Sequence, residues 1–205
     1  MRPSRALTLV LGALILTWVG QAAVGYWQVG RLEPVLNEET NLTVPPVPSG
    51  LAQTGARVFA AEGCLECHSL SVRGPTGSAD LTRGWGQRRS VARDYLRDQP
   101  VQLGSSRLGP DLANYGERLG TNGFNLVRLF DPRLVVTNST CEGAPYLFEV
   151  RTITGEPSAD ALATGEAGRE IVPKAAARQL AAYLASLGSS AELPEAPLPA
   201  KEEAK

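Results

Sequence analysis

The chain of 205 residues contains one histidine, His68, one methionine, Met1, and only three cysteines. A structural zinc site usually needs four cysteine or histidine ligands. Only four such side chains exist here, and Cys64, Cys67 and His68 lie in one short stretch, so a zinc site is disfavoured. Lysine and arginine (20) nearly balance aspartate and glutamate (21), which argues against general nucleic-acid binding.

These scarce residues gather in the stretch GCLECHSL, residues 63–70. Cys-x-x-Cys-His is the spacing of a c-type haem attachment site. Cys64 and Cys67 can each add to one vinyl group of haem, and the imidazole of His68 then reaches the iron from one face. A thioredoxin-like Cys-x-x-Cys would occur near a βαβ pattern, and the sequence shows none. We therefore predict one covalently bound haem c, and no second histidine is available for the opposite face of its iron.

The N-terminus has the composition of a membrane anchor. Arg2 and Arg5 precede an uncharged, apolar run at residues 6–29, which is long enough to cross a bilayer as a helix. The two arginines predict that the N-terminus stays in the cytoplasm and that the rest is exported. A cleaved signal peptide is the alternative, because GQA resembles a cleavage site, but the apolar run continues beyond it. We expect a single-pass anchor at 1–30 in the bacterial inner membrane, with the haem domain in the periplasm.

Beyond the anchor, the sequence predicts a helical domain between two extended segments. Residues 31–53 contain VPPVPSG and are typical of a linker. One helix is expected from Thr54, as its N-cap, to just before the haem loop, and another over PKAAARQLAAYLASLG, residues 173–188. Residues 189–205 are rich in proline, glutamate and lysine and are expected to form a disordered tail. The haem domain at 54–188 is thus predicted to be all-α, with the two helices arranged as in a class I cytochrome c.

Several longer patterns are similar to one protein family. The stretch LTRGWGQRRSVARDY, continued by DQPVQLGSSRLGPDLANYG, covers residues 81–116, and LFDPRLVV, YLFE and EIVP follow it. Together they resemble the membrane-anchored monohaem cytochrome c subunit of cbb3-type haem–copper oxidases (FixO/CcoO type). The resemblance covers residues 50–188 and the anchor.

The resemblance implies an electron-transfer subunit and not an autonomous enzyme. Its partners would be the membrane oxidase core subunit and other cytochrome c subunits or donors. Two alternatives stay open: a haem-based redox or gas sensor or ligand-binding cytochrome, and an electron-transfer protein like the small subunit of nitric oxide reductase. The RGWG, GPDLA and DPR patterns favour the oxidase subunit over the reductase subunit.

The resemblance also implies roles for single residues. Cys64 and Cys67 would carry the thioether bonds, and His68 would be the proximal iron ligand. Pro110, in LGPDL, matches the proline whose carbonyl accepts a hydrogen bond from that histidine, with an ordinary turn proline as the alternative. Because a guanidinium pairs well with carboxylates, Arg107 is the candidate partner of a haem propionate, against the alternative of a solvated basic face.

The family's distal ligand is a methionine in a segment like S.MP.Y..L, whereas this sequence has STCEGAPYLFE at residues 139–149. Aligning DPRLVV before it and YLFE after it places Cys141 at the methionine position and Glu142 where a proline usually follows. Cys141 is therefore our candidate distal iron ligand. An inert thiol, an open or water-filled site, and ligation by Lys174 or Asn138 are the alternatives.

Overall fold

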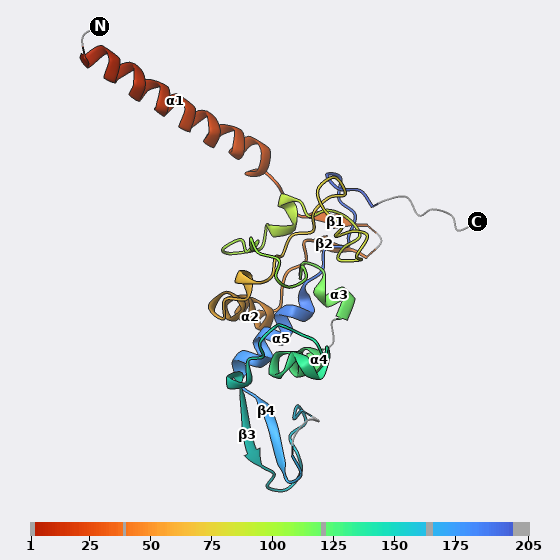
Figure 1. Ribbon diagram of the computed structural model, residues 1–205. Coiled ribbons are helices and arrows are strands. Elements are labelled where there is room, and N and C mark those ends of the chain that lie inside the picture. Colours follow the sequence, from red (N-terminus) through yellow and green to blue (C-terminus); the bar gives the residue numbers. More distant parts are fainter. Residues whose placement is uncertain (1–2, 39, 120–121, 163–165, 199–205) are drawn as a thin grey trace.

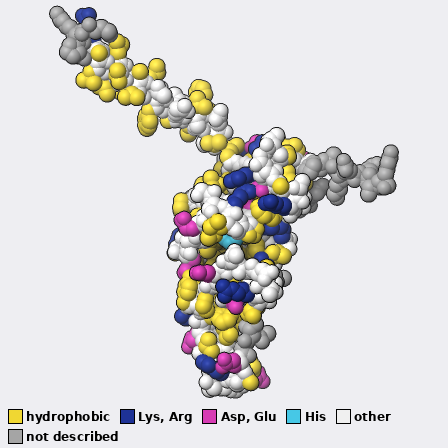
Figure 2. Space-filling model, viewed as in Figure 1, with side chains coloured by type: hydrophobic (Ala, Val, Ile, Leu, Met, Phe, Trp, Pro, Cys, Tyr) yellow, Lys and Arg dark blue, Asp and Glu magenta, His cyan; other side chains and the backbone are white. Residues whose placement is uncertain are grey.

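The computed structural model describes residues 3–38, 40–119, 122–162 and 166–198. Helix α1 (Pro3–Val29) projects away from the rest of the chain (Figure 1). From Ser4 to Val29 it is long and apolar enough to cross a membrane, and 0% of its most apolar window is buried in the protein. Figure 2 shows hydrophobic side chains along the part of this helix that is drawn in colour. Helix α1 is therefore a candidate membrane span, and its length is sufficient for a bilayer core.

Helix α2 (Gly50–Ala61) begins earlier than the sequence suggested. We predicted Thr54 as its N-cap, but the side-chain oxygen of Ser49 accepts a hydrogen bond from the backbone N–H of Ala52 at 3.2 Å. Ser49 has the extended backbone that an N-cap requires. Thr54 instead lies inside the helix, where its hydroxyl donates to the carbonyl of Gly50 at 2.7 Å. The helix therefore includes residues 50–53, which we had assigned to the linker.

Helix α5 (Ala175–Ser186) packs against α2 at very short range. A Cβ atom on Gly55 would lie 2.0 Å from the carbonyl oxygen of Gln179, so a glycine is needed for the two backbones to approach this closely. Beside this contact, the rings of Phe59 and Tyr183 meet edge to face with their centroids 5.3 Å apart. The packing fixes the end of α2 that leads directly into the haem motif.

Shorter helices complete the body of the chain. Helices α3 (Tyr115–Leu119) and α4 (Asn122–Phe130) lie against α5. Single 3-10 turns occupy the loops at Cys64–Glu66, Ala92–Tyr95, Pro132–Leu134 and Pro145–Leu147. The main core contains buried side chains from the helices and loops, among them Phe59, Leu112, Leu126, Leu147, Ile171 and Leu180.

We had predicted an all-α domain, but the structure also contains two antiparallel ribbons. Strand β1 (Val35–Asn37) pairs with β2 (Leu42–Val44) inside the segment expected to be a linker. Strand β3 (Phe148–Thr152) pairs with β4 (Arg169–Pro173) and extends beyond the helices at the far end from α1 (Figure 1). In both ribbons β-branched residues lie in paired positions, as Val35 does opposite Val44, which favours strands over helices.

The C-terminal segment packs where we had predicted disorder. Within 189–205, residues 189–198 are described, and Leu193 is 0% exposed. Leu193 and Ala196 bury against Val44 and Val91 in a second small core. The carboxylate of Glu195 pairs with Arg93, so a residue that we had interpreted as part of a solvated tail is neutralised. Residues 199–205 lie outside the described part of the chain.

Candidate haem-binding site

The Cys-x-x-Cys-His motif forms one tight turn directly after α2. Gly63 adopts a left-handed conformation with φ of +68°, which a glycine accommodates without strain and which lets the chain turn away from the helix. The backbone N–H groups of Cys67 and His68 both donate to the carbonyl of Cys64, at 3.3 and 3.0 Å. Both thiols are free, with Cys64 half-buried and Cys67 exposed. The turn therefore presents two thiols and one imidazole within five residues.

The loop around Pro110 contacts the imidazole of His68 and fixes its orientation. Its Nδ1 lies 2.8 Å from the carbonyl oxygen of Pro110. Because a carbonyl only accepts hydrogen bonds, Nδ1 carries the proton and Nε2 is left with a lone pair for a metal. The ring also lies against Gly109, where a Cβ atom would be 2.2 Å from Cε1 of His68. The contact that the resemblance implied for Pro110 is present in the structure.

A carboxylate joins the same two segments beside this contact. Asp111 is 0% exposed. Its Oδ2 accepts from the hydroxyl of Ser69 at 2.6 Å and from the N–H of Ser71 at 2.8 Å. Its Oδ1 accepts from the N–H of Ala113 at 2.9 Å. We had quoted the LGPDL pattern only for its proline, and the missed signal was an aspartate in an otherwise apolar, turn-forming sequence.

Arg107, our candidate for a propionate partner, has protein carboxylates as neighbours. Its Nη1 lies 2.6 Å from both carboxylate oxygens of Asp80, and its Nη2 donates to the carbonyl of Ser71 at 2.5 Å. The same Nη2 is 3.7 Å from Asp111, and the guanidinium carbon lies 5.8 Å from the ring centre of Trp85. Pairing with a propionate stays a prediction for Arg107, whose buried Nε has no hydrogen-bond partner.

Cys141 lies in an exposed bend whose neighbours are firmly attached to α4. The N–H of Ala144 donates to the carbonyl of Leu129 at 2.7 Å, and a Cβ atom on Gly143 would lie 2.3 Å from the carbonyl of Phe130. The Cys141 thiol itself makes only a 3.5 Å contact with the carbonyl of the next residue among the described contacts.

The three thiols share one electrostatic environment. Burial, the carboxylate of Glu62 and the thiol of Cys141 together raise the pKa of Cys64 to about 11. Partial loss of water and the nearby thiol of Cys67 raise the pKa of Cys141. Cys141, 74 residues further along the chain than Cys67, thus lies near enough to the motif to affect the pKa of Cys64.

The alternative distal candidates have other surroundings. The ammonium group of Lys174 donates to the carbonyl of Tyr146 at 2.8 Å. This contact places Lys174 on the side of the Cys141 loop from which β3 and β4 extend. Asn138 is exposed in the bend that precedes Cys141. The hydroxyl of Tyr146 donates to the carboxylate of Glu62 and so links the loop that follows Cys141 to the end of α2, a contact that the sequence analysis missed.

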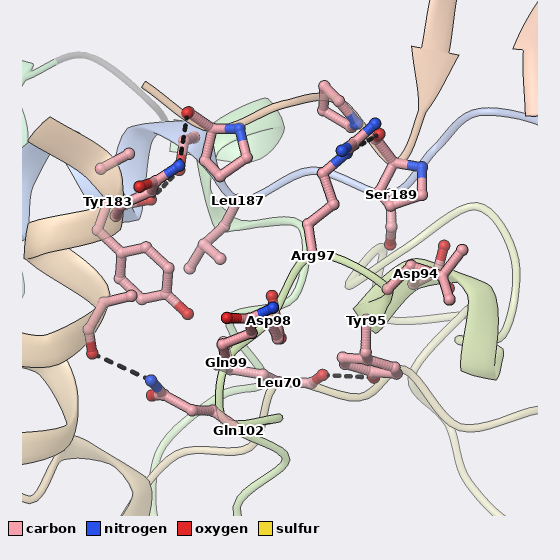
Figure 3. A pocket seen from close by; sticks show the side chains of 18 of the residues that line it. Leu70, Asp94, Tyr95, Arg97, Asp98, Gln99, Gln102, Tyr183, Leu187 and Ser189 are labelled. Atoms are coloured by element: carbon pink, nitrogen blue, oxygen red, sulfur yellow. Dashed lines mark hydrogen bonds between the residues drawn. The ribbon is translucent and has the colours of Figure 1, made fainter. Parts of the chain in front are cut away.

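A separate cavity of about 820 Å³ lies between the proline-rich segment 45–49, the segment 94–102 and the helices α2 and α5 (Figure 3). Its described lining includes neither the three cysteines nor His68. Tyr183 and Gln102 face it, and burial raises the pKa of Asp98, which also lines it. The cavity is therefore distinct from the Cys-x-x-Cys-His turn.

The residues of the motif fit a covalently held haem. Two free thiols stand on one turn, the imidazole is oriented by Pro110 and Gly109, and a third thiol approaches from a distant loop. Comparison with protein families matches residues 36–165 to the family described as cytochrome C oxidase, mono-heme subunit/FixO. No curated protein matches the chain. The family match gives no support to the sensor or nitric oxide reductase alternatives.

Proposed function

The chain belongs to the FixO family of mono-haem cytochrome c oxidase subunits, and on this premise we propose that Cys64 and Cys67 hold one haem c covalently, with His68 as the proximal iron ligand. The chain is an electron-transfer subunit of a cbb3-type oxidase. The observation that carries the residue assignment is the 2.8 Å contact between Nδ1 of His68 and the carbonyl of Pro110, beside two free thiols. A hydrogen bond at the remote ring nitrogen fixes the tautomer and orientation of a metal-binding histidine.

The chemistry of the site divides simply between the cofactor and the protein. A bound haem supplies a one-electron Fe(III)/Fe(II) couple, and the protein sets its position and potential. The chain itself holds, orients and partly shields the group and catalyses no bond rearrangement. Its partners in this role are the oxidase core subunit and the cytochromes that donate electrons to it.

Cys141 is the proposed distal ligand. Met1 is the only methionine and His68 the only histidine, so neither usual distal side chain is available near the motif. The approach of Cys141 to Cys64 and Cys67 supports this assignment, as does its alignment with the methionine position of the family.

The arrangement of the chain supports a membrane-anchored haem domain. The α2–α5 packing beside the haem motif is the helix arrangement expected of a class I cytochrome c, with two β-ribbons added. Helix α1 would anchor the chain in the bacterial inner membrane. Arg2 and Arg5 precede the apolar run and would stay on the cytoplasmic side, so the haem domain would lie in the periplasm.

Denaturing gels stained for haem test the attachment. The chain matured in a competent host should keep its haem through denaturation, because two thioether bonds hold it. Cys64→Ala or Cys67→Ala should weaken haem retention, and His68→Ala should lose the native low-spin spectrum. Cys141→Ala is the matched control, since it removes a thiol and should leave the gel stain unchanged. A wild-type band without haem would contradict the proposal.

Topology has its own test. A reporter that is active only in the periplasm, fused after Lys205, should be active, and alkaline carbonate should leave the chain in the membrane fraction. Recovery of a soluble protein that begins near residue 23 would instead show a cleaved signal peptide.

A further inference from the structure

The hydrogen bond between His68 and Pro110 has a second bond directly beside it. Ser69 follows His68 in the chain, and Asp111 follows Pro110. The hydroxyl of Ser69 donates to Asp111 at 2.6 Å, one residue along from the 2.8 Å contact of the imidazole. The N–H of Leu112 donates back to the carbonyl of Ser69 at 2.8 Å. Hydrogen bonds therefore join residues 68–69 to residues 110–112 at consecutive positions.

The carboxylate of Asp111 is built into the interior of the protein. It is 0% exposed, and it accepts hydrogen bonds from both Ser69 and Ser71, so it grips the segment after His68 at two points. Burying a carboxylate is costly unless it is hydrogen-bonded and has a nearby positive charge. Both conditions hold here, because three donors reach its two oxygens and Nη2 of Arg107 is 3.7 Å away.

Arg107 interacts with Asp80 as well as with Asp111. Its Nη1 is bound more closely by Asp80, at 2.6 Å. One guanidinium is thus shared by two buried carboxylates. Arg118 also attracts Asp111 electrostatically, and its Nη2 donates to the backbone carbonyl of Asp111. Asp111 is therefore a buried carboxylate in a network of two carboxylates and two arginines.

We propose that Asp111 is the positioning residue of the proximal histidine: it fixes the segment after His68 against the Pro110 loop and so maintains the hydrogen bond at Nδ1. This inference rests on the proposed role of His68 as iron ligand. A shorter and less mobile hydrogen bond at Nδ1 increases the electron density on the imidazole. The imidazole then donates more strongly to the iron, which stabilises Fe(III) relative to Fe(II). The carboxylate charge favours Fe(III) as well, so both effects of Asp111 act in the same direction.

The expected effect of Asp111→Asn follows from both contributions. Asparagine keeps the shape, but its single oxygen can occupy only one of the two carboxylate positions. The variant must therefore lose either the bonds from Ser69 and Ser71 or the bond from Ala113. A unit charge about 10 Å from a redox centre, at an effective dielectric constant of about 20, shifts its equilibrium by more than tenfold. At a fixed applied potential we expect at least a tenfold higher ratio of reduced to oxidised protein, which is 59 mV for one electron.

Two further variants separate position from charge and from stability. Ser69→Ala removes the 2.6 Å bond to Asp111 and leaves every charge in place. Asp94→Asn is the matched control, because Asp94 is also a buried carboxylate that accepts from an arginine, Arg88, at 2.7 Å and from the N–H of Val91 at 2.9 Å. Neither of its partners is next to His68 or Pro110 in the chain.

The experiment compares the full-length holoproteins in detergent by redox titration, and it follows deuterium exchange of the histidine ring N–H by resonance Raman or NMR spectroscopy. Asp111→Asn and Ser69→Ala should both exchange the ring N–H at least several-fold faster than wild type. The potential should rise in both variants, and more in Asp111→Asn. Asp94→Asn should leave the exchange of the ring N–H unchanged, even if it unfolds at a lower temperature, because none of its hydrogen-bond partners adjoins His68 or Pro110.

The outcomes separate this inference from the proposed function. Wild-type exchange and potential in Asp111→Asn and Ser69→Ala, with the histidine-ligated spectrum intact, would overturn the positioning role and leave the haem assignment standing. A lower unfolding temperature alone would have the same consequence. If Asp111→Asn does not fold, Ser69→Ala alone decides by its exchange rate. A His68→Ala variant with an unchanged spectrum would instead remove the proposed function itself.

Discussion

Gly109→Ala is expected to displace the proximal histidine from its loop. The new Cβ atom would lie 2.2 Å from Cε1 and 2.7 Å from Nδ1 of His68, whereas carbon atoms in contact are about 3.5–4.0 Å apart. The ring cannot simply swing away, because Nδ1 is bonded to the Pro110 carbonyl at 2.8 Å. The loop is held as well, since the N–H of Gly109 donates to the carbonyl of Cys67 at 2.9 Å. Ring and loop must therefore separate by roughly 1.5 Å.

The cost of this separation can be worked out from its two parts. Overpacking a filled site costs about 1–3 kcal/mol, and losing one hydrogen bond costs about 1 kcal/mol. The sum, about 2–4 kcal/mol, corresponds to a fall in unfolding temperature of about 4–16 °C for a chain of this size.

Thermal unfolding of the holoprotein, followed by its haem absorbance, measures the shift, and the ferric spectrum reports the histidine. Gly77→Ala is the control, because a Cβ atom there meets nothing within 4 Å. Equal unfolding temperatures for the two variants, together with a wild-type ferric spectrum for Gly109→Ala, would refute the reasoning.

Three other outcomes are expected. Gly55→Ala would place a Cβ atom 2.0 Å from a backbone oxygen of α5 and should lower the free energy of unfolding in urea by about 1–3 kcal/mol, whereas Gly50→Ala, with open space around it, should not lower it. Burial by itself would raise the pKa of Asp80, but hydrogen bonds, first that from Arg107, lower it below its usual value of 3.8. The pair therefore stabilises the fold above about pH 4 and loses this effect as the pH falls through the lowered pKa, so the stability difference between wild type and Asp80→Asn should shrink in acid. Cys141→Met should raise the reduction potential and give the near-infrared charge-transfer band of methionine ligation, and an unchanged ferric spectrum and potential in Cys141→Ala would exclude thiol ligation.

Local patterns in the sequence were enough to find α1, α2, α5 and the motif. The apolar spacing of Leu180, Tyr183, Leu184 and Leu187 predicted α5. The first three side chains are buried, whereas Leu187 follows the end of the helix and is partly buried against the same core. The Cys-x-x-Cys-His spacing located the candidate haem turn, because its chemistry depends on residues adjacent in the chain. Helix α1 was equally accessible, since a long uncharged run needs no tertiary partner to be recognised.

The errors share a physical cause, which is dependence on partners far away in the chain. Leu193 is buried only because Val44 and Val91 form a surface for it. The partner of Arg107 was missed for the same reason: nothing in the sequence shows that Asp80, 27 residues earlier, lies beside it, while pairing of Arg107 with a propionate stays a prediction. Arg107 lies among other basic residues in the sequence, and this pattern does not indicate which carboxylate it pairs with. Its partner could only be identified in the folded structure.

The charge at the candidate distal position constrains how the subunit can work. A thiolate from Cys141 is an anionic, strong donor, so it favours Fe(III) over Fe(II) far more than the neutral thioether of methionine does. Axial ligands move haem potentials across about 0.8 V, and each 59 mV is a factor of ten for one electron. A potential lower by a few tenths of a volt would make reduction by an ordinary high-potential donor unfavourable by several powers of ten. Electron transfer through such a site requires an unusually reducing donor, or protonation or loss of the thiolate on reduction. Otherwise this haem lies off the main path of electrons through the oxidase. The role proposed for the buried carboxylate of Asp111 would act in the same direction, so the proximal and distal sides of the site would both favour the oxidised state.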